Sequence, residues 1–267
     1  MITRAVVLAA GRGSRLQRDD PSVRLTAAQE RAALAGLKAL VPIHGRPYLA
    51  YALHELAEAG FREVCIVVRP GDDPVARAVS RLRPRRLRLS FAAQPRPLGT
   101  ADAVLAAEAF GEDDQFIVIN GDNLYPASAL AALRELDGPG LIGFVAAALV
   151  ARSNVPAERL ASFGLVRERD GWLQRVVEKP GPGADTSGEA ALISMTCWRF
   201  DPSIFHVCRQ VQPSPRGEVE LPDAVALAVE AGAGFRVVPM AEGVLDLSER
   251  GDIPALEDLL AGREPAL

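Results

Sequence analysis

The chain has 267 residues, 49% of them hydrophobic and 24% charged, and its formal net charge is −4. This length and apolar content are enough to bury a substantial core. The basic residues are dispersed, apart from a run at residues 81–88 that is either a solvated edge or a contact for an anionic partner. No stretch reaches the roughly 18 apolar residues of a membrane helix, and the N-terminus has no signal-peptide pattern. We therefore expect a cytoplasmic protein that binds neither nucleic acid nor a membrane.

The cysteines and histidines do not form a recognisable site. Cys65, Cys197 and Cys208 are far apart in apolar surroundings, which is typical of buried thiols rather than of a disulfide or a thiolate metal site. No histidine has a serine, a cysteine or a second histidine at a useful spacing. We therefore expect neither a nucleophilic triad nor a zinc site.

Residues 5–16 combine a strand with a glycine-rich basic loop. The apolar run at residues 6–8 is typical of a central parallel strand. Gly11 and Gly13 have no side chains, so backbone N–H groups can approach an anion, and Arg15 can neutralise phosphate charge. The loop lacks the third glycine of a dinucleotide fingerprint and the Gly-Lys-Ser/Thr of a P-loop. It predicts a triphosphate-binding loop, although a strand followed by two glycines is a weak signal on its own.

Strands and helices alternate in the first half of the chain. The polar segment after the loop contains a helix that Thr26 can cap and Gly36 can end. Alternation of this kind predicts a parallel sheet with ligands at the carboxyl ends of the strands. The other elements expected here are helices at 47–60, at 74–82 and from residue 100, and strands at 64–68, 87–93 and 116–119.

Polar side chains follow three of these strand ends. Arg15 lies beyond the first strand, Gln94 beyond the strand at 87–93, and Asp122 beyond the strand at 116–119. The carboxyl ends of parallel strands meet at one edge of a sheet, so we expect these side chains to share one rim.

The pattern changes after residue 136. We expect a long strand at 141–150, and a hairpin whose arms, 163–166 and 174–177, flank the turn Asp170-Gly171. A flexible Gly/Pro stretch follows at 181–188. The remaining elements expected are a strand at 193–200, helices at 202–211 and 220–231, short strands at 235–239 and 244–245, and a helix from residue 252.

Two carboxylates are candidate metal ligands. Asp122 is a hard carboxylate at the rim where phosphates would lie, which suits Mg²⁺, although an Asp-Asn pair can also simply make a turn or a helix cap. Asp246 is a candidate second ligand, and a helix cap next to Ser248 is an equally good interpretation.

Four further side chains suit a phosphorylated ligand. Lys38 and Lys179 can neutralise phosphate charge or can simply be solvated. Glu178 can accept hydrogen bonds from a polyhydroxylated ligand or pair with Lys179. Gln94 offers a donor and an acceptor, which reading the edge of a pyrimidine requires.

An ordered set of motifs resembles the sugar-1-phosphate nucleotidyltransferases, most closely the glucose-1-phosphate thymidylyltransferase branch. The motifs are LAAGRGSRL, Lys38 with LVPI, QPRPLGTADAV, INGDN, VVEKP, PSPRGEVELPDAV and VLD, and together they cover most of the chain. The resemblance implies an α/β fold with a Rossmann-like, three-layer, mixed but mainly parallel sheet. It also implies a single domain, 1–267, in which residues 1–136 mainly bind the nucleotide and residues 137–267 mainly bind the sugar phosphate.

The resemblance implies an Mg²⁺-dependent enzyme that couples a nucleoside triphosphate, dTTP or UTP, to a sugar 1-phosphate and releases pyrophosphate. It further implies a homo-oligomer, a dimer or a tetramer. The catalytic positions are Arg15, Lys38, Asp122 and Lys179, with Arg15 stabilising the departing pyrophosphate. The nucleotide contacts would be Leu8, Ala10, Gly11, Gly13, Ser14, Arg15, Gln94, Pro95, Gly99 and Thr100. The sugar-phosphate contacts would be Asn123, Gly164, Glu178 and Lys179, and the Mg²⁺ ligands Asp122 and Asp246.

The chain departs from the family pattern at three places. The segment between Arg15 and Lys38 is longer than usual, and it can be a lid, an oligomer contact or a neutral insertion. Leu37 stands where the family usually has a proline. Met195 stands near a position where the thymidylyltransferase branch has glycine, and a bulky side chain there would reshape the sugar pocket. The stretch around Asp246 lacks the usual tryptophan and Gly-Thr, which makes this residue a weaker metal-ligand candidate than Asp122.

Two alternatives stay open. The same reaction can use a cyclitol phosphate or an amino-sugar phosphate, or GTP or CTP as the nucleotide. A protein of a different class, a non-catalytic regulator that binds nucleotide sugars, would have the same fold. A protein that only binds need not keep every charge-compensating group, so the presence of Arg15, Lys38, Asp122 and Lys179 favours an enzyme.

Overall fold

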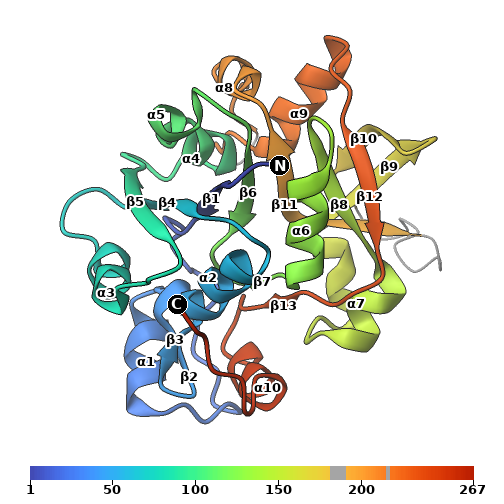
Figure 1. Cartoon of the computed structure of the whole chain (residues 1–267). Helices are drawn as coiled ribbons and strands as arrows, with labels where there is room; N and C mark the ends of the chain where they lie inside the picture. Colours follow the sequence, from blue (N-terminus) through green and yellow to red (C-terminus); the bar gives the residue numbers. More distant parts are fainter. Residues whose placement is uncertain (181–190, 215–216) are drawn as a thin grey trace.

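The computed structural model describes residues 1–180, 191–214 and 217–267. Within these residues, a nine-stranded mixed sheet has the order β5-β4-β1-β6-β11-β8-β12-β10-β9, with helices on both faces (Figure 1). Two small ribbons pair β2 (Pro42–Ile43) with β3 (Arg46–Pro47), and β7 (Asn123–Leu124) with β13 (Leu245–Asp246). This architecture confirms the expected fold class.

The elements have the following bounds. The strands of the large sheet are β1 (Arg4–Leu8), β4 (Glu63–Val68), β5 (Arg88–Ala93), β6 (Phe116–Asn120), β8 (Gly140–Val145), β9 (Gly164–Arg169), β10 (Trp172–Val177), β11 (Leu192–Phe200) and β12 (Arg236–Met240). The helices are α1 (Ala27–Leu34), α2 (Tyr48–Glu58), α3 (Pro74–Leu82), α4 (Thr100–Ala106), α5 (Glu108–Gly111), α6 (Ala127–Glu135), α7 (Ala146–Arg152), α8 (Ser203–Cys208), α9 (Leu221–Glu230) and α10 (Asp252–Leu259). Two 3-10 helices are η1 (Lys38–Leu40) and η2 (Ala157–Ser162).

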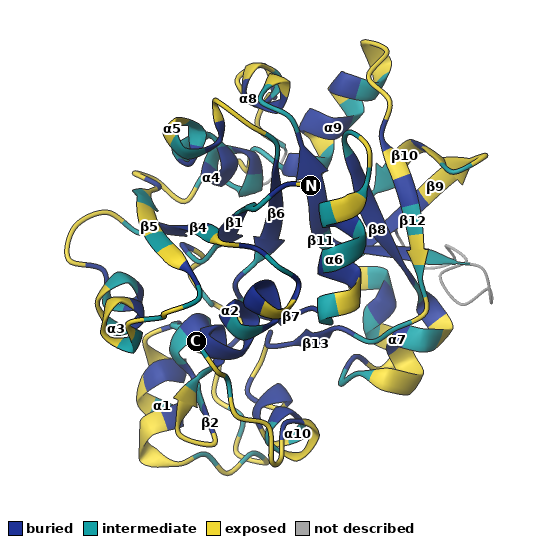
Figure 2. Ribbon diagram, viewed as in Figure 1, coloured by how far each residue is buried: buried dark blue, intermediate teal, exposed yellow. Residues whose placement is uncertain are grey.

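Alternating side chains build one hydrophobic layer on each face of the sheet. In β1, Val6 packs in the layer that includes residues of α4, α8 and α9. Its neighbours Ala5 and Val7 pack in the opposite layer, with residues of α2, α3, α6 and α7. The central strands are therefore buried on both sides, whereas exposed residues lie on the outer faces of the helices (Figure 2). This burial explains why these strands are continuous apolar runs in the sequence.

The parallel strands end level with one another. Leu8 of β1 pairs with Val67 of β4 on one side and with Asn120 of β6 on the other. At the next pair, Val68 of β4 is opposite Ala93 of β5. The loops that follow all four strands therefore start from the same edge of the sheet, as the sequence predicts.

The expected strand at 141–150 is wrong in its second half. The strand β8 ends at Val145, and the helix α7 begins at Ala146. The Ala146 N–H donates to the Ala191 carbonyl at 2.9 Å. The chain leaves the sheet after this residue, where α7 begins. An apolar run does not by itself distinguish a buried strand from a buried helix, and the alanines at this point favour a helix. The other expected elements are present with somewhat different ends, and the Gly/Pro stretch at 181–188 lies outside the described residues.

The long segment after the basic loop is docked on the C-terminal part of the chain. Thr26 and Gln29 form a capping box at the start of α1, as Thr26 predicts. The Gln29 amide also donates to Glu257 Oε1 of α10, at 2.8 Å. The Arg250 guanidinium, which is buried, donates to both carboxylate oxygens of Glu30, at 2.6 and 2.9 Å. The insertion is thus fixed to α10 and to the segment before it.

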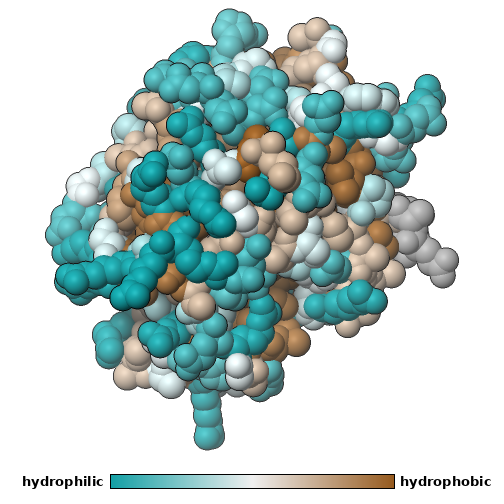
Figure 3. Space-filling view, in the orientation of Figure 1, coloured by the Kyte–Doolittle hydropathy of each residue, from teal (hydrophilic) through white to brown (hydrophobic). Residues whose placement is uncertain are grey.

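Polar side chains cover most of the face seen in Figure 1, and hydrophobic residues gather there only in small separate groups (Figure 3). In the part of the chain that the structure describes, no helix combines the length and the apolar character needed to cross a membrane.

Candidate functional site

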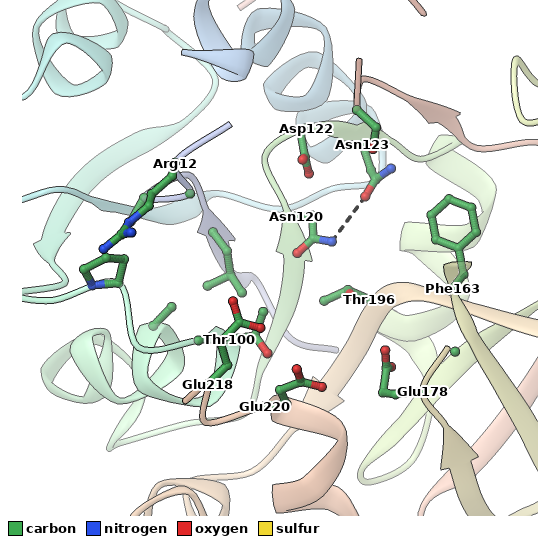
Figure 4. A pocket seen from close by; sticks show the side chains of 18 of the residues that line it. Arg12, Thr100, Asn120, Asp122, Asn123, Phe163, Glu178, Thr196, Glu218 and Glu220 are labelled. Atoms are coloured by element: carbon green, nitrogen blue, oxygen red, sulfur yellow. Dashed lines mark hydrogen bonds between the residues drawn. The ribbon is translucent and has the colours of Figure 1, made fainter. Parts of the chain in front are cut away.

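A cavity of about 700 Å³ opens at the carboxyl ends of β1, β5 and β6. Both halves of the chain line it. The first half contributes the loop after β1, the segment that joins β5 to α4, and the end of β6. The second half contributes residues at the ends of the β9–β10 hairpin, the middle of β11 and the segment before α9. Figure 4 shows polar side chains from these segments pointing into the cavity.

The structure brings almost all of the residues predicted from the sequence to this cavity. Pro95 instead lines a neighbouring cavity of about 360 Å³, and Lys38 lines another of about 250 Å³. Gln94 lines both the main cavity and the one beside Pro95. The predicted residues that line the main cavity are Leu8, Ala10, Gly11, Gly13, Ser14, Arg15, Gln94, Gly99, Thr100, Asp122, Asn123, Gly164, Glu178, Lys179 and Asp246.

The loop after β1 is held by the end of the insertion. Gly13 has φ +63° and Gly36 has φ +64°, a region that glycine adopts without strain. A Cβ atom at Gly13 would overlap the backbone of Gly36, and a Cβ atom at Gly36 would overlap the carbonyl of Arg12. The two glycines therefore permit a backbone contact between the basic loop and the insertion, which fixes the path of the loop.

Arg69 also holds this loop, and the sequence analysis missed it. Its guanidinium donates to the Gly11 carbonyl at 2.6 Å and to the Ala10 carbonyl at 3.4 Å, and it reaches the Gly36 carbonyl at 3.5 Å. Arg69 directly follows β4, just as Gln94 directly follows β5. The rule that places Gln94 at the rim would therefore have found Arg69 too.

The orientation of the Gln94 amide is set by its partners. The side chain is 5% exposed, and its Nε2 donates to the Gly99 carbonyl at 3.0 Å and to Asp102 Oδ2 at 2.8 Å. A carbonyl and a carboxylate only accept hydrogen bonds, so the amide nitrogen must face them. This arrangement leaves the amide oxygen as the acceptor that Gln94 offers to a ligand.

A charged pair lies at the end of β6. Lys38 Nζ is 2.7 Å from Asp122 Oδ2. Both side chains are partly buried, and water weakens their attraction less than it would at the surface. The residue pair joins the start of η1, just after the insertion, to the rim of the sheet.

The second candidate carboxylate is more deeply enclosed. Asp246 is 3% exposed, accepts a 2.9 Å hydrogen bond from Asn123 Nδ2 and pairs with Arg159. Burial raises the pKa of Asp246 above its ordinary value, and the nearby charge of Asp122 raises it further, while Arg159 opposes both effects. Asp246 is opposite Asn123 in the β7–β13 ribbon, and the next N–H, that of Leu247, donates to the Asp122 carbonyl at 2.9 Å, so Asp246 and Asp122 are near neighbours.

The two carboxylates fit a hard divalent cation with an incomplete protein shell. In the described residues, no three His, Cys, Asp or Glu side chains come together as a metal-binding group. Mg²⁺ is usually held by one or two carboxylates and completes its octahedron with water and substrate phosphate oxygens. Asp122 and Asp246 would hold the ion in this way.

The other end of the cavity contains Glu178 and Lys179. Gly164 leaves room for the Glu178 carboxylate, because a Cβ atom at Gly164 would lie 2.8 Å from Glu178 Oε1 and 2.5 Å from Val176 Cγ1. Gly164 of β9 also pairs with Ser194 of β11, and Ser194 lines the cavity too. Carboxylate, hydroxyl and ammonium groups thus line the same cavity, a combination that suits a ligand with hydroxyl and phosphate groups.

Met195 lines the main cavity, as its place in the sequence predicts, but most of its side chain is enclosed. It is 2% exposed and packs in the hydrophobic core. The next residue, Thr196, is only partly buried, and Figure 4 shows its side chain at the cavity. Thr196 is therefore the more exposed of the two side chains that line the cavity at this point of β11.

Other cavity residues come from contacts that the sequence does not reveal. Gly99 has φ +124°, and a Cβ atom there would overlap the carbonyl of Val219. The Val219 N–H bonds the Leu98 carbonyl at 2.6 Å, which brings Glu218 and Glu220 to the cavity wall beside Thr100 (Figure 4). Gly99 thus allows a close contact between two distant segments, in addition to any contact with a nucleoside. Arg12, Asn120 and Phe163 also line the cavity.

Comparisons with known proteins agree with this arrangement. Residues 4–242 match the family model described as nucleotidyl transferase. The chain is 33% identical to a glucose-1-phosphate thymidylyltransferase of Streptomyces griseus over 87% of its own length, and it spans 59% of that relative. It is 26% identical to the UTP–glucose-1-phosphate uridylyltransferase AglF of Haloferax volcanii, with 96% of each chain covered. The structure of a UTP-bound UGPase from Acinetobacter baumannii has a TM-score of 0.73 at 18% identity, over 100% of this chain and 96% of that one.

The contact between the basic loop and the insertion predicts the effect of one substitution. Gly36→Ala places a methyl group against the Arg12 carbonyl and displaces the loop, so we expect UTP to bind at least about 10-fold more weakly in calorimetry. Gly45→Ala is the matched control, because Gly45 also has a positive φ of +76° but has nothing within 4 Å of an added Cβ atom. Equal affinities for the two variants would show that the contact does not shape the loop.

Proposed function

The chain belongs to the nucleotidyl transferase family, and we propose that it transfers the nucleotidyl group of a nucleoside triphosphate to a sugar 1-phosphate, giving an NDP-sugar and pyrophosphate. One observation carries the proposal. Arg12 of the basic loop lies on one side of a single cavity and Glu178 on the other, with Asp122 between them (Figure 4). Gln94 and Lys179 line the same cavity, and Lys38 pairs with Asp122.

The basic loop would bind the triphosphate. Backbone N–H groups at Gly11 and Gly13 can contact phosphate oxygens, because no side chain covers them. The Arg15 guanidinium adds a bidentate donor for the pyrophosphate that leaves. Gly36 and Arg69 fix the loop before the ligand arrives, so binding does not have to pay the entropy of ordering it.

The acceptor needs no general base. The phosphate oxygen of a sugar 1-phosphate that attacks the α-phosphorus is already anionic, and the new P–O bond forms as the bond to pyrophosphate breaks. Catalysis then consists of holding two anions in line and compensating the charge that develops. Lys179 would hold the sugar phosphate, and Lys38 would approach the α-phosphate. The Glu178 carboxylate would accept hydrogen bonds from sugar hydroxyls, and the Asn123 amide would donate or accept them.

We propose Mg²⁺ as the cofactor, held by Asp122 and Asp246. When bound, the ion would supply positive charge to the phosphate oxygens and keep them in a fixed orientation. The Lys38 ammonium, which is 2.7 Å from Asp122 Oδ2, would add its own positive charge beside the phosphate oxygens. Arg159 would keep the buried Asp246 ionised and oriented.

The orientation of Gln94 favours uracil or thymine as the base. Its amide oxygen is free to accept, and both bases carry a donor at N3, whereas the N3 of cytosine is an acceptor. UTP and dTTP therefore suit this site better than CTP. Guanine also carries a ring N–H, and GTP is the comparison that tests whether the cavity discriminates by size.

A pyrophosphate-release assay tests the proposed reaction. We expect release when the protein is mixed with Mg²⁺, UTP or dTTP, and a member of a panel of hexose, amino-sugar and cyclitol phosphates, and no release with EDTA. Asp122→Ala should lower the rate about 10²–10³-fold, because it removes the side chain that would hold the ion. Silence across the panel, together with tight NDP-sugar binding, would instead favour the regulator.

The base preference predicts the effect of a second substitution. Asp102→Asn replaces one of the two obligate acceptors of the Gln94 amide nitrogen with an amide, so that only the Gly99 carbonyl still requires the original orientation. A reversed Gln94 that presents its nitrogen to cytosine then costs less than in the wild type. We expect the ratio of kcat/KM for UTP to that for CTP to fall about 10-fold, as loss of a charged hydrogen-bond acceptor implies. Glu108→Gln, the same kind of change outside the cavity, should leave the ratio unchanged. A ratio in Asp102→Asn equal to that of the wild type would remove the support for Gln94 as an acceptor.

A further inference from the structure

The strand β11 changes neighbours in the middle of the cavity wall. Its first residues, Leu192 to Ser194, pair with β9, and its last, Cys197 to Phe200, pair with β6. The pairing with β8 shifts register between Ser194 and Trp198. Thr196 lies in this irregular stretch, where the strand passes from one half of the sheet to the other. Such bulges redirect a side chain without ending the strand.

Thr196 has a backbone conformation that its side chain disfavours. Its φ is +58°, and it is the only β-branched residue with a positive φ in the described part of the chain. A branched Cβ makes this left-handed region costly, whereas glycine adopts it freely. Strain of this kind persists only where the surroundings enforce it, and it is concentrated at functional sites.

A buried tyrosine enforces the conformation. The Tyr125 hydroxyl is 2.5 Å from the Met195 carbonyl and 3.1 Å from the Thr196 carbonyl. The same hydroxyl accepts from the Asn120 N–H at 3.3 Å, so it joins the end of β6 to the irregular stretch of β11. The direction of the Thr196 side chain is therefore fixed by the backbone around it.

This direction places the side chain at the acceptor end. In Figure 4 Thr196 lies between Asn120 and Glu178, and Ser194, two residues earlier, pairs with Gly164 beside Glu178. We propose that the Thr196 side chain limits the size of the acceptor and excludes sugar 1-phosphates with a bulky substituent on the ring. This inference rests on the proposed function of the cavity.

The chemistry of the substituent can be stated. The threonine side chain is similar in size to the atoms that an acetamido group adds when it replaces a hydroxyl. Removing the side chain should therefore make room for an N-acetylated hexosamine 1-phosphate. A steric difference of this size typically changes specificity about 10-fold or more.

The test compares glucose 1-phosphate with N-acetylglucosamine 1-phosphate in the wild type, Thr196→Gly and Thr196→Val. We expect Thr196→Gly to shift the ratio of the two kcat/KM values at least about 10-fold toward the N-acetylated acceptor. Thr196→Val keeps the shape and removes the hydroxyl, so it should keep the wild-type ratio. Thr196→Gly should unfold at or above the wild-type temperature, because glycine relieves the positive φ.

The relative affinities for UDP-glucose and UDP-N-acetylglucosamine, measured by calorimetry, should shift in the same direction. This second measurement tests the size limit set by Thr196 independently of the proposed nucleotidyl transfer. A wild type that binds both NDP-sugars without transferring any nucleotide contradicts the proposed reaction, and the size limit is still tested by the affinities. The role of Thr196 would be overturned if the ratio of the two kcat/KM values in Thr196→Gly stayed within twofold of the wild-type ratio. If no turnover is seen, the ratio of the two NDP-sugar affinities decides in the same way.

Discussion

The site depends on the level ends of four parallel strands. Hydrogen bonding in register puts Leu8, Val68, Ala93 and Asn120 at one edge of the sheet. Each strand then passes directly into a polar residue or loop, so groups more than a hundred residues apart in sequence share one rim. The buried faces of these strands fix the register, because a shift by one residue would exchange the two hydrophobic layers.

Around this rim the chain brings cationic and anionic side chains together. In the proposed reaction, the cationic groups of the basic loop, Lys38 and Lys179 would surround the phosphates, and the carboxylates of Asp122 and Asp246 would hold a divalent ion. Backbone contacts hold these groups in place without occupying the cavity, as between Gly13 and Gly36. A site of this kind acts by positioning and by charge compensation, which agrees with a reaction whose nucleophile is already ionised.

The sequence predicts the strands of the first half and the convergence at their ends, because periodic apolar runs and the residues that follow them are local features. It does not separate β8 from α7, because an apolar run suits both. It also misses contacts between distant segments. Gly99 packs against Val219, which is more than a hundred residues away in sequence. The left-handed conformation of Thr196 depends on Tyr125, about seventy residues away, so no local pattern in the sequence predicts either feature.

The central claim is that the acceptor phosphate attacks the α-phosphorus of the nucleotide. The most direct measurement follows UTP labelled at its α-phosphate in the presence of Mg²⁺ and an accepted sugar 1-phosphate. We expect the label to enter the NDP-sugar and an equal amount of unlabelled pyrophosphate to be released. Label recovered in UMP, or in UTP alone while the sugar phosphate remains unchanged, would contradict it.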